Sequence, residues 1–138
     1  MRAKTEATQA VNLEIRANIS AVAPWREAVR QGDRDRYLTA MFAPEPARAD
    51  LFVLYAFNLE VAKIRESVSE GMIGAIKLQW WRDVIAQIYA SGRFPLGNPM
   101  VEALAGLVGR RGLSGAHFDA LLDARARDME EEIGRAHV

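Results

Sequence analysis

Polar side chains that could bind a ligand follow directly on an apolar run in the middle of the chain. Residues 51–57 are apolar without interruption, and Asn58, Glu60, Lys63 and Glu66 come soon after. The apolar turns of this helix are expected to be buried on every side. A helix of this kind that turns polar either leaves the core at that point or lines a pocket, and both interpretations stay open here.

A second candidate is the cation Lys77, in a helix that we expect from residue 72 to residue 90. At 100° per residue the apolar side chains of this helix form one broad face, and Lys77 falls in the middle of it. Its stem could pack there while the ammonium group reaches solvent. Alternatively, the ammonium group points into a cavity, where it pairs with Glu60 or Glu66 or binds an anionic ligand.

The composition excludes several classes of protein. The chain has 138 residues, half of them hydrophobic, which suits one domain with a substantial core. Its 18 basic and 18 acidic residues balance, so we expect no nucleic-acid partner. It contains no cysteine, which excludes disulfides and thiolate metal sites, and its two histidines lack metal-ligand spacing. No apolar run is long enough to span a bilayer.

The remaining pattern predicts an all-α fold. Apolar residues recur at helical spacing, and no stretch alternates with period two. We expect a loose N-terminus over residues 1–10 and a single helical domain over residues 11–138. Within it, Pro24 is expected to open a separate short helix over residues 25–30, because proline suits the first turn of a helix.

Several motifs, taken in order, resemble the squalene/phytoene synthase family. They are Asp33-Arg-Asp-Arg-Tyr-Leu-Thr-Ala-Met-Phe-Ala-Pro44, Arg48, Leu54-Tyr-Ala-Phe57, Ile76-Lys-Leu-Gln-Trp-Trp-Arg-Asp83 and Leu122-Asp-Ala-Arg-Ala-Arg-Asp128. The resemblance spans about residues 28–129. It implies a helical bundle of the isoprenoid-synthase type around an apolar cavity, of which this chain would hold only the N-terminal half. Enzymes of the family join two prenyl diphosphates head to head, with Mg²⁺ held by two aspartate-rich motifs.

The chain departs from the family pattern where the first aspartate-rich motif should lie. The three acidic positions of that motif fall on Ala62, Lys63 and Glu66. Mg²⁺ prefers oxygen ligands, and a diphosphate group leaves readily only when such cations neutralise it. The resemblance therefore implies no metal site, no cofactor and lost prenyl transfer. Mg²⁺ is expected only in the alternative, an active prenyltransferase. The second motif would lie beyond Val138.

Other details resemble one branch of the family, which is related to a mitochondrial respiratory complex I assembly factor. They are Asn58-Leu-Glu60, the pair Arg65-Glu66 and the block Gln79-Trp-Trp-Arg-Asp83. This resemblance implies a binding or assembly protein, with a respiratory-complex subunit as the candidate partner. A further alternative is a non-catalytic protein that binds an isoprenoid or a prenyl diphosphate. We expect a bacterial cytoplasmic protein, with peripheral contact at the inner membrane as an option.

Six side chains are predicted to bind the ligand or partner: Asn58, Lys77, Arg36, Arg48, Asp123 and Arg127. Arg36 could equally belong to a helix cap with surface ion pairs, and the charges around Asp123 could face solvent. In the family, the bundle continues well past the equivalent of Val138, with further helices that close the cavity. Without them, apolar surface at residues 51–57 and 72–89 would be partly uncovered, so we expect the chain to form a homo-oligomer.

Overall fold

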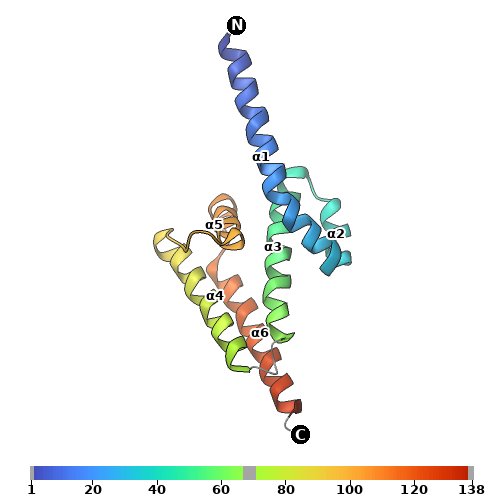
Figure 1. The fold of residues 1–138 in the computed structure, drawn as a ribbon, viewed down its shortest axis with the longest axis vertical. Coiled ribbons are helices and arrows are strands. Elements are labelled where there is room, and N and C mark those ends of the chain that lie inside the picture. Colours follow the sequence, from blue (N-terminus) through green and yellow to red (C-terminus); the bar gives the residue numbers. More distant parts are fainter. Residues whose placement is uncertain (1, 67–70, 137–138) are drawn as a thin grey trace. The chain divides into compact units, whose positions relative to one another are not determined.

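The computed structural model describes residues 2–66 and 71–136, and every regular element in these ranges is helical. The α-helices are α1 (Arg2–Gly32), α2 (Arg34–Met41), α3 (Glu45–Lys63), α4 (Gly71–Ser91), α5 (Pro99–Arg111) and α6 (Gly115–Ala136) (Figure 1). A short 3₁₀ turn over residues 64–66 follows α3. The expected all-α fold is therefore confirmed. Over the described ranges, no helix is both long enough and apolar enough to cross a membrane.

The chain divides into two compact units, residues 1–52 and residues 53–138, and the boundary falls within α3. The first unit contains α1, α2 and the beginning of α3. The second contains the remainder of α3 together with α4, α5 and α6. The single domain expected over residues 11–138 stays a prediction.

In the first unit, α1 runs without a break from Arg2 to Gly32, and this corrects two expectations. Residues 2–10 are helical where a loose N-terminus was expected, because their alanines, Lys4 and Glu6 are good helix formers. Pro24 lies inside α1 and does not open a separate helix. A proline removes one backbone hydrogen bond, and here the helix formers on both sides of it continue the same helix.

Asp33 separates α1 from α2. Its backbone N–H donates to the Val29 carbonyl at 2.8 Å, and its carboxylate accepts the Arg36 backbone N–H at 3.1 Å. A carboxylate in this position satisfies an N–H group that the first turn of a helix leaves without a partner. The chain then reverses so that α2 packs against α1, and the Tyr37 ring stacks on Phe52 at a centroid distance of 5.9 Å.

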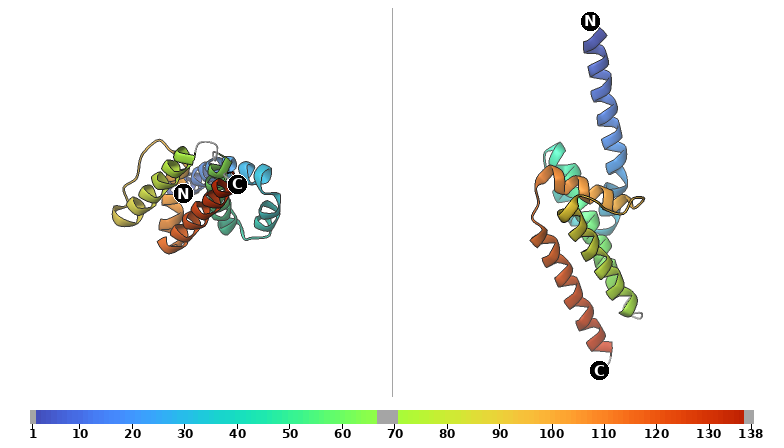
Figure 2. Two further views of the ribbon diagram at one scale, coloured as in Figure 1. Left: turned by 90° about the horizontal axis from the view of Figure 1, so that it is seen from below. Right: turned by 90° about the vertical axis from the view of Figure 1, so that its left-hand side faces the viewer.

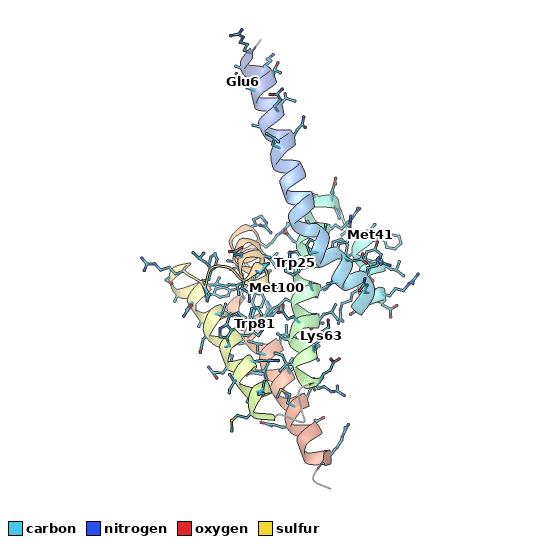
Figure 3. The ribbon with its side chains drawn as sticks, in the orientation of Figure 1. Glu6, Trp25, Met41, Lys63, Trp81 and Met100 are labelled. Carbon is cyan, nitrogen blue, oxygen red and sulfur yellow. The ribbon has the colours of Figure 1, made fainter. Side chains whose placement is uncertain are left out.

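The second unit has an apolar core to which α3, α4, α5 and α6 all contribute. Phe57 is fully buried and meets the rings of Trp81 and Phe118 edge to face, at centroid distances of 5.1 and 5.8 Å. Met100 and Trp81, both labelled in Figure 3, belong to this core. Its other members are Val53, Ala56, Val61, Ile64, Leu78, Val84, Ile85, Ile88, Val101, Leu104, Leu107, Leu122 and Met129.

The antiparallel helices α4 and α6 pack along each other and are joined near both ends (Figure 2). At the start of α4, a Cβ atom on Gly74 would overlap the Met129 side chain of α6, so glycine permits the close approach. At the end of α4, the Tyr89 ring lies over Gly115, the first residue of α6. The alignment of these two helices is therefore fixed by close contacts at two separate points.

Candidate functional site

Asn58, the first polar residue after the apolar run, meets α6 inside the second unit. Arg125 Nη2 donates to Asn58 Oδ1 at 3.1 Å, across 67 positions of sequence. Arg125 Nη1 donates to Asp128 Oδ2 at 3.2 Å. Asn58, Arg125 and Asp128 thus form one cluster, called the α3–α6 cluster below, in which a guanidinium group lies between an amide and a carboxylate.

Arg125 occupies a position that the helical pattern assigns to the core. It lies three residues after Leu122 and four before Met129, which are both buried, so the three share one face of α6. The Arg125 side chain is only 25% exposed. Its Nε is buried and has no hydrogen-bond partner among the described residues. A buried donor without a partner is unfavourable, so stability alone does not explain an arginine at this position.

A second polar contact joins α6 to α4. Arg82 Nη2 lies 2.7 Å from Asp123 Oδ1. Both side chains are partly exposed to solvent, and ion pairs of this kind contribute little to stability. Asp123, predicted to bind a ligand, is therefore already paired with an arginine of the neighbouring helix.

The degenerate motif does not gather acidic groups. Ala62 is half-buried, whereas Lys63 and Glu66 are exposed. In the part of the chain that the structure describes, no three histidine, cysteine, aspartate or glutamate side chains lie where they could hold a metal ion. Asn58 and Ala62 are one turn apart on the same face of α3. The guanidinium group of Arg125 therefore bonds to the helix one turn before the position where the family's motif begins.

Glu60, which lies on α3 just before the degenerate motif, is also a poor metal ligand. Partial burial raises the pKa of Glu60 above its ordinary value of 4.5, and the positive charge of Lys63 only partly opposes this shift. A carboxyl group whose charged form is disfavoured in this way attracts a cation less strongly.

Lys77 is exposed on α4, although the pattern of the helix puts it in the middle of the apolar face. A long lysine stem can pack on apolar surface while its ammonium group reaches solvent. The face of α4 that is buried carries Leu78, Trp81, Val84, Ile85 and Ile88. A second apolar set, called the exposed α4 stripe below, consists of Met72, Ile73, Ile76 and Trp80. The single broad face expected from the sequence is therefore buried along one part and exposed along the adjoining part.

The other predicted residues do not join the α3–α6 cluster. Arg36 Nη1 bonds to Asp33 at 2.6 Å, as part of the cap of α2. Arg48 donates from Nη2 to the Ala43 carbonyl at 3.2 Å, and its buried Nε has no partner among the described residues. Both arginines lie in the first unit, and Arg127 is exposed on α6. A ligand-binding role for these residues stays a prediction.

Sequence reasoning left open the role of Arg125, the residue that organises the cluster, and did not choose it as a binding residue. Asp123 and Arg127 were chosen from this part of α6, whereas Arg125 is the residue that bonds to Asn58. A signal was present in the sequence: Phe118, Leu122, Arg125 and Met129 follow each other at spacings of four, three and four. A charged residue in such an apolar series marks a polar contact inside the fold or a bound group.

Comparison with known proteins finds one matching family and several relatives that share one name. The family model described as squalene/phytoene synthase matches residues 29–134. NADH dehydrogenase (ubiquinone) complex I, assembly factor 6, is 31% identical to the chain over 109 residues in Bos taurus and 30% identical over 109 residues in Homo sapiens. Each alignment covers 79% of this chain and 32% of the relative. The homolog from Drosophila melanogaster is 30% identical over 106 residues, which cover 72% of this chain and 31% of the relative.

The chain thus spans about a third of the length of the curated relatives that it matches. No solved structure matches it. The family match covers most of the residues that build α2 to α6, and it agrees with the expected isoprenoid-synthase type of helical fold, of which the chain covers a part. The helical fold and this match together show that the chain belongs to the squalene/phytoene synthase family.

Proposed function

We propose that the chain is a binding or assembly protein that no longer carries out head-to-head prenyl transfer. The observation that carries this proposal is the state of the first aspartate-rich motif, where Ala62 and Lys63 replace two carboxylates and Glu66 is exposed. The similarity to relatives named as complex I assembly factors supports the same conclusion.

The residues present do not fit Mg²⁺. The ion takes several oxygen ligands, usually carboxylates and water. Around the motif, the ammonium of Lys63 and the guanidinium of Arg125 are cationic, and among the described residues the carboxyl groups do not converge on one point. We therefore propose that the chain uses no metal cofactor, and no prenyl-transfer step is assigned to it.

The proposed partner is a subunit of a respiratory complex of the complex I type. This follows the names of the relatives in Bos taurus, Homo sapiens and Drosophila melanogaster. A bacterial cytoplasmic location with peripheral contact at the inner membrane suits such a partner, because respiratory complexes are assembled at a membrane. The balanced charge of the chain supports a protein partner over a nucleic acid. We also propose that the chain self-associates through the exposed α4 stripe.

Two measurements, one on the purified chain and one in cells, separate this function from its alternatives. The first is release of pyrophosphate from farnesyl diphosphate in the presence of Mg²⁺, with a Glu66→Ala variant as the comparison. We expect no release above the blank from either protein. Release that depends on Glu66 would contradict the proposal and favour a prenyltransferase.

The second measurement is native capture of the tagged chain from cells that make complex I. A complex I subunit should be retained by the wild-type chain, and an isoprenoid should not be extracted with it. An extracted isoprenoid without any complex I subunit would favour lipid binding without turnover.

A further inference from the structure

Two kinds of side chain lie between α3 and α6: apolar residues, and the polar pair Arg125 and Asn58. They differ in how strongly they fix the alignment of the two helices. On α3 the buried residues Val53, Phe57 and Val61 recur every four positions, and on α6 the buried Leu122 follows Phe118 after four positions and precedes Met129 by seven. Apolar contacts are non-directional. A shift of one helix past the other by one turn, which is about 5 Å, would again place apolar side chains of one series opposite those of the other.

The hydrogen bond between Arg125 and Asn58 does not tolerate such a shift. Asn58 offers its Oδ1 at one height along α3, and a donor one turn away lies well beyond hydrogen-bond distance. Arg125 is itself oriented from its own helix, because its Nη1 donates to Asp128. The guanidinium group is thus held from both helices, and its rigid planar shape transmits the position of one to the other.

The arrangement of α4 on α6 has its own determinants. Gly74 packs against Met129 at one end, and the Tyr89 hydroxyl donates to the Leu113 carbonyl at the other. Neither contact involves α3. Phe57 of α3 also contacts Trp81 of α4 and Phe118 of α6, but neither Gly74 nor Tyr89 bonds to the α3–α6 cluster, so these contacts of α4 with α6 remain when Arg125 is changed.

We propose that Arg125 is a register lock, a partly buried arginine that holds α6 on α3 in one alignment through Asn58 while lowering the stability of the fold. The unpartnered Nε is the unfavourable part of this device. Replacement of buried polar groups by apolar residues of similar volume is often neutral or stabilising. A methionine at position 125 should therefore preserve folding and release the register.

The test measures distances between helices in the complete chain. Because the chain contains no cysteine, pairs of spin labels can be attached at introduced cysteines without removing any native residue. Lys63→Cys with Glu130→Cys reports on α3 and α6, and Lys77→Cys with Glu130→Cys reports on α4 and α6. All three sites are exposed. The same pairs are measured in Arg125→Met and in Arg127→Met, where an exposed arginine of the same helix receives the same change.

We expect one narrow distance for both pairs in the wild-type background. Arg125→Met should broaden the α3–α6 distance or add a second one displaced by about 5 Å, with a thermal midpoint equal to or above that of the wild type. Its α4–α6 distance should not change. Arg127→Met should leave both distances as they are.

Two results would overturn the proposal. One is an Arg125→Met chain that keeps the narrow α3–α6 distance, which would mean that the apolar core alone sets the register. The other is equal broadening in Arg127→Met. If Arg125→Met fails to fold, Asn58→Leu provides the deciding measurement. Asn58→Leu removes the acceptor and leaves Arg125 in place, so it should broaden the α3–α6 distance. A narrow α3–α6 distance in this variant would reject the proposed register lock.

Discussion

The Tyr89 hydroxyl of α4 donates to the Leu113 backbone carbonyl at 2.7 Å, and the ring of the same tyrosine covers Gly115. One side chain therefore both holds the connection that leads into α6 and packs on the first residue of that helix. Burial raises the pKa of Tyr89 above its ordinary value of 10.0, so the phenol stays protonated and able to donate at neutral pH.

Loss of this hydroxyl should have a small, measurable effect. Tyr89→Phe keeps the ring and removes the donor, and we expect the free energy of unfolding to fall by about 0.5–1 kcal/mol. Tyr89→Leu should lower it further, because the packing on Gly115 is lost as well. Urea denaturation followed by circular dichroism measures both. A Tyr89→Phe chain as stable as the wild type would show that water replaces the Leu113 bond without loss.

Features that depend on neighbouring residues could be predicted from the sequence, whereas features that depend on residues far apart in the chain could not. The all-α fold was predictable because helical spacing is local. The break expected at Pro24 was wrong because a local rule for proline was applied where the flanking helix formers prevail. The importance of Arg125 depends on Asn58, 67 positions away, and no local pattern reveals that neighbour. Similarly, the position of α6 decides which side of α4 is buried.

The core of the second unit should depend strongly on Phe57. Its ring is fully buried and contacts both Trp81 and Phe118, so Phe57→Ala leaves a large cavity. We expect a loss of about 3–5 kcal/mol, much of the stability of a small domain. Phe42→Ala is the matched control, since Phe42 is 91% exposed and its loss should change stability by less than about 0.5 kcal/mol. Equal effects of the two changes in thermal unfolding would contradict the assignment of the core.

Asp33 should make the first unit sensitive to acid. Its hydrogen bond with the Arg36 side chain holds the pKa of the carboxyl group below its ordinary value of 3.8. The unfolded chain therefore binds more protons than the folded chain near this pH, and the contribution of the carboxylate to stability is complete above pH 3.8. It is lost as the pH falls through the lower pKa of the folded state.

The measurement compares Asp33→Ala with Asp33→Asn at neutral and at acid pH. The alanine variant loses the cap of α2 and should be less stable by about 1 kcal/mol at pH 7. Asparagine retains a capping oxygen, so the Asp33→Asn variant should lose less stability than Asp33→Ala. The stability of Asp33→Asn should also lack the part of the pH dependence that this carboxylate causes. An unchanged acid dependence in Asp33→Asn would show that other carboxyl groups cause it.

The exposed α4 stripe should make the chain associate with itself. Ile76 is 61% exposed, and together with Met72, Ile73 and Trp80 it forms a continuous apolar surface on one helix. Trp80 is held edge to face against the buried Trp81, at a centroid distance of 4.8 Å, so it offers a pre-oriented aromatic surface to a second molecule. In sedimentation equilibrium at micromolar concentration, we expect an average mass above the 15.3 kDa of one chain.

Ile76→Glu places a charge in the middle of the stripe and should return the mass to that of a monomer. Leu96→Glu adds the same charge at a residue that is 85% exposed and lies outside the stripe, so its mass should equal that of the wild type. The decisive contrary result is a wild-type monomer that binds no hydrophobic dye, since it would mean that the stripe is already covered within a single molecule.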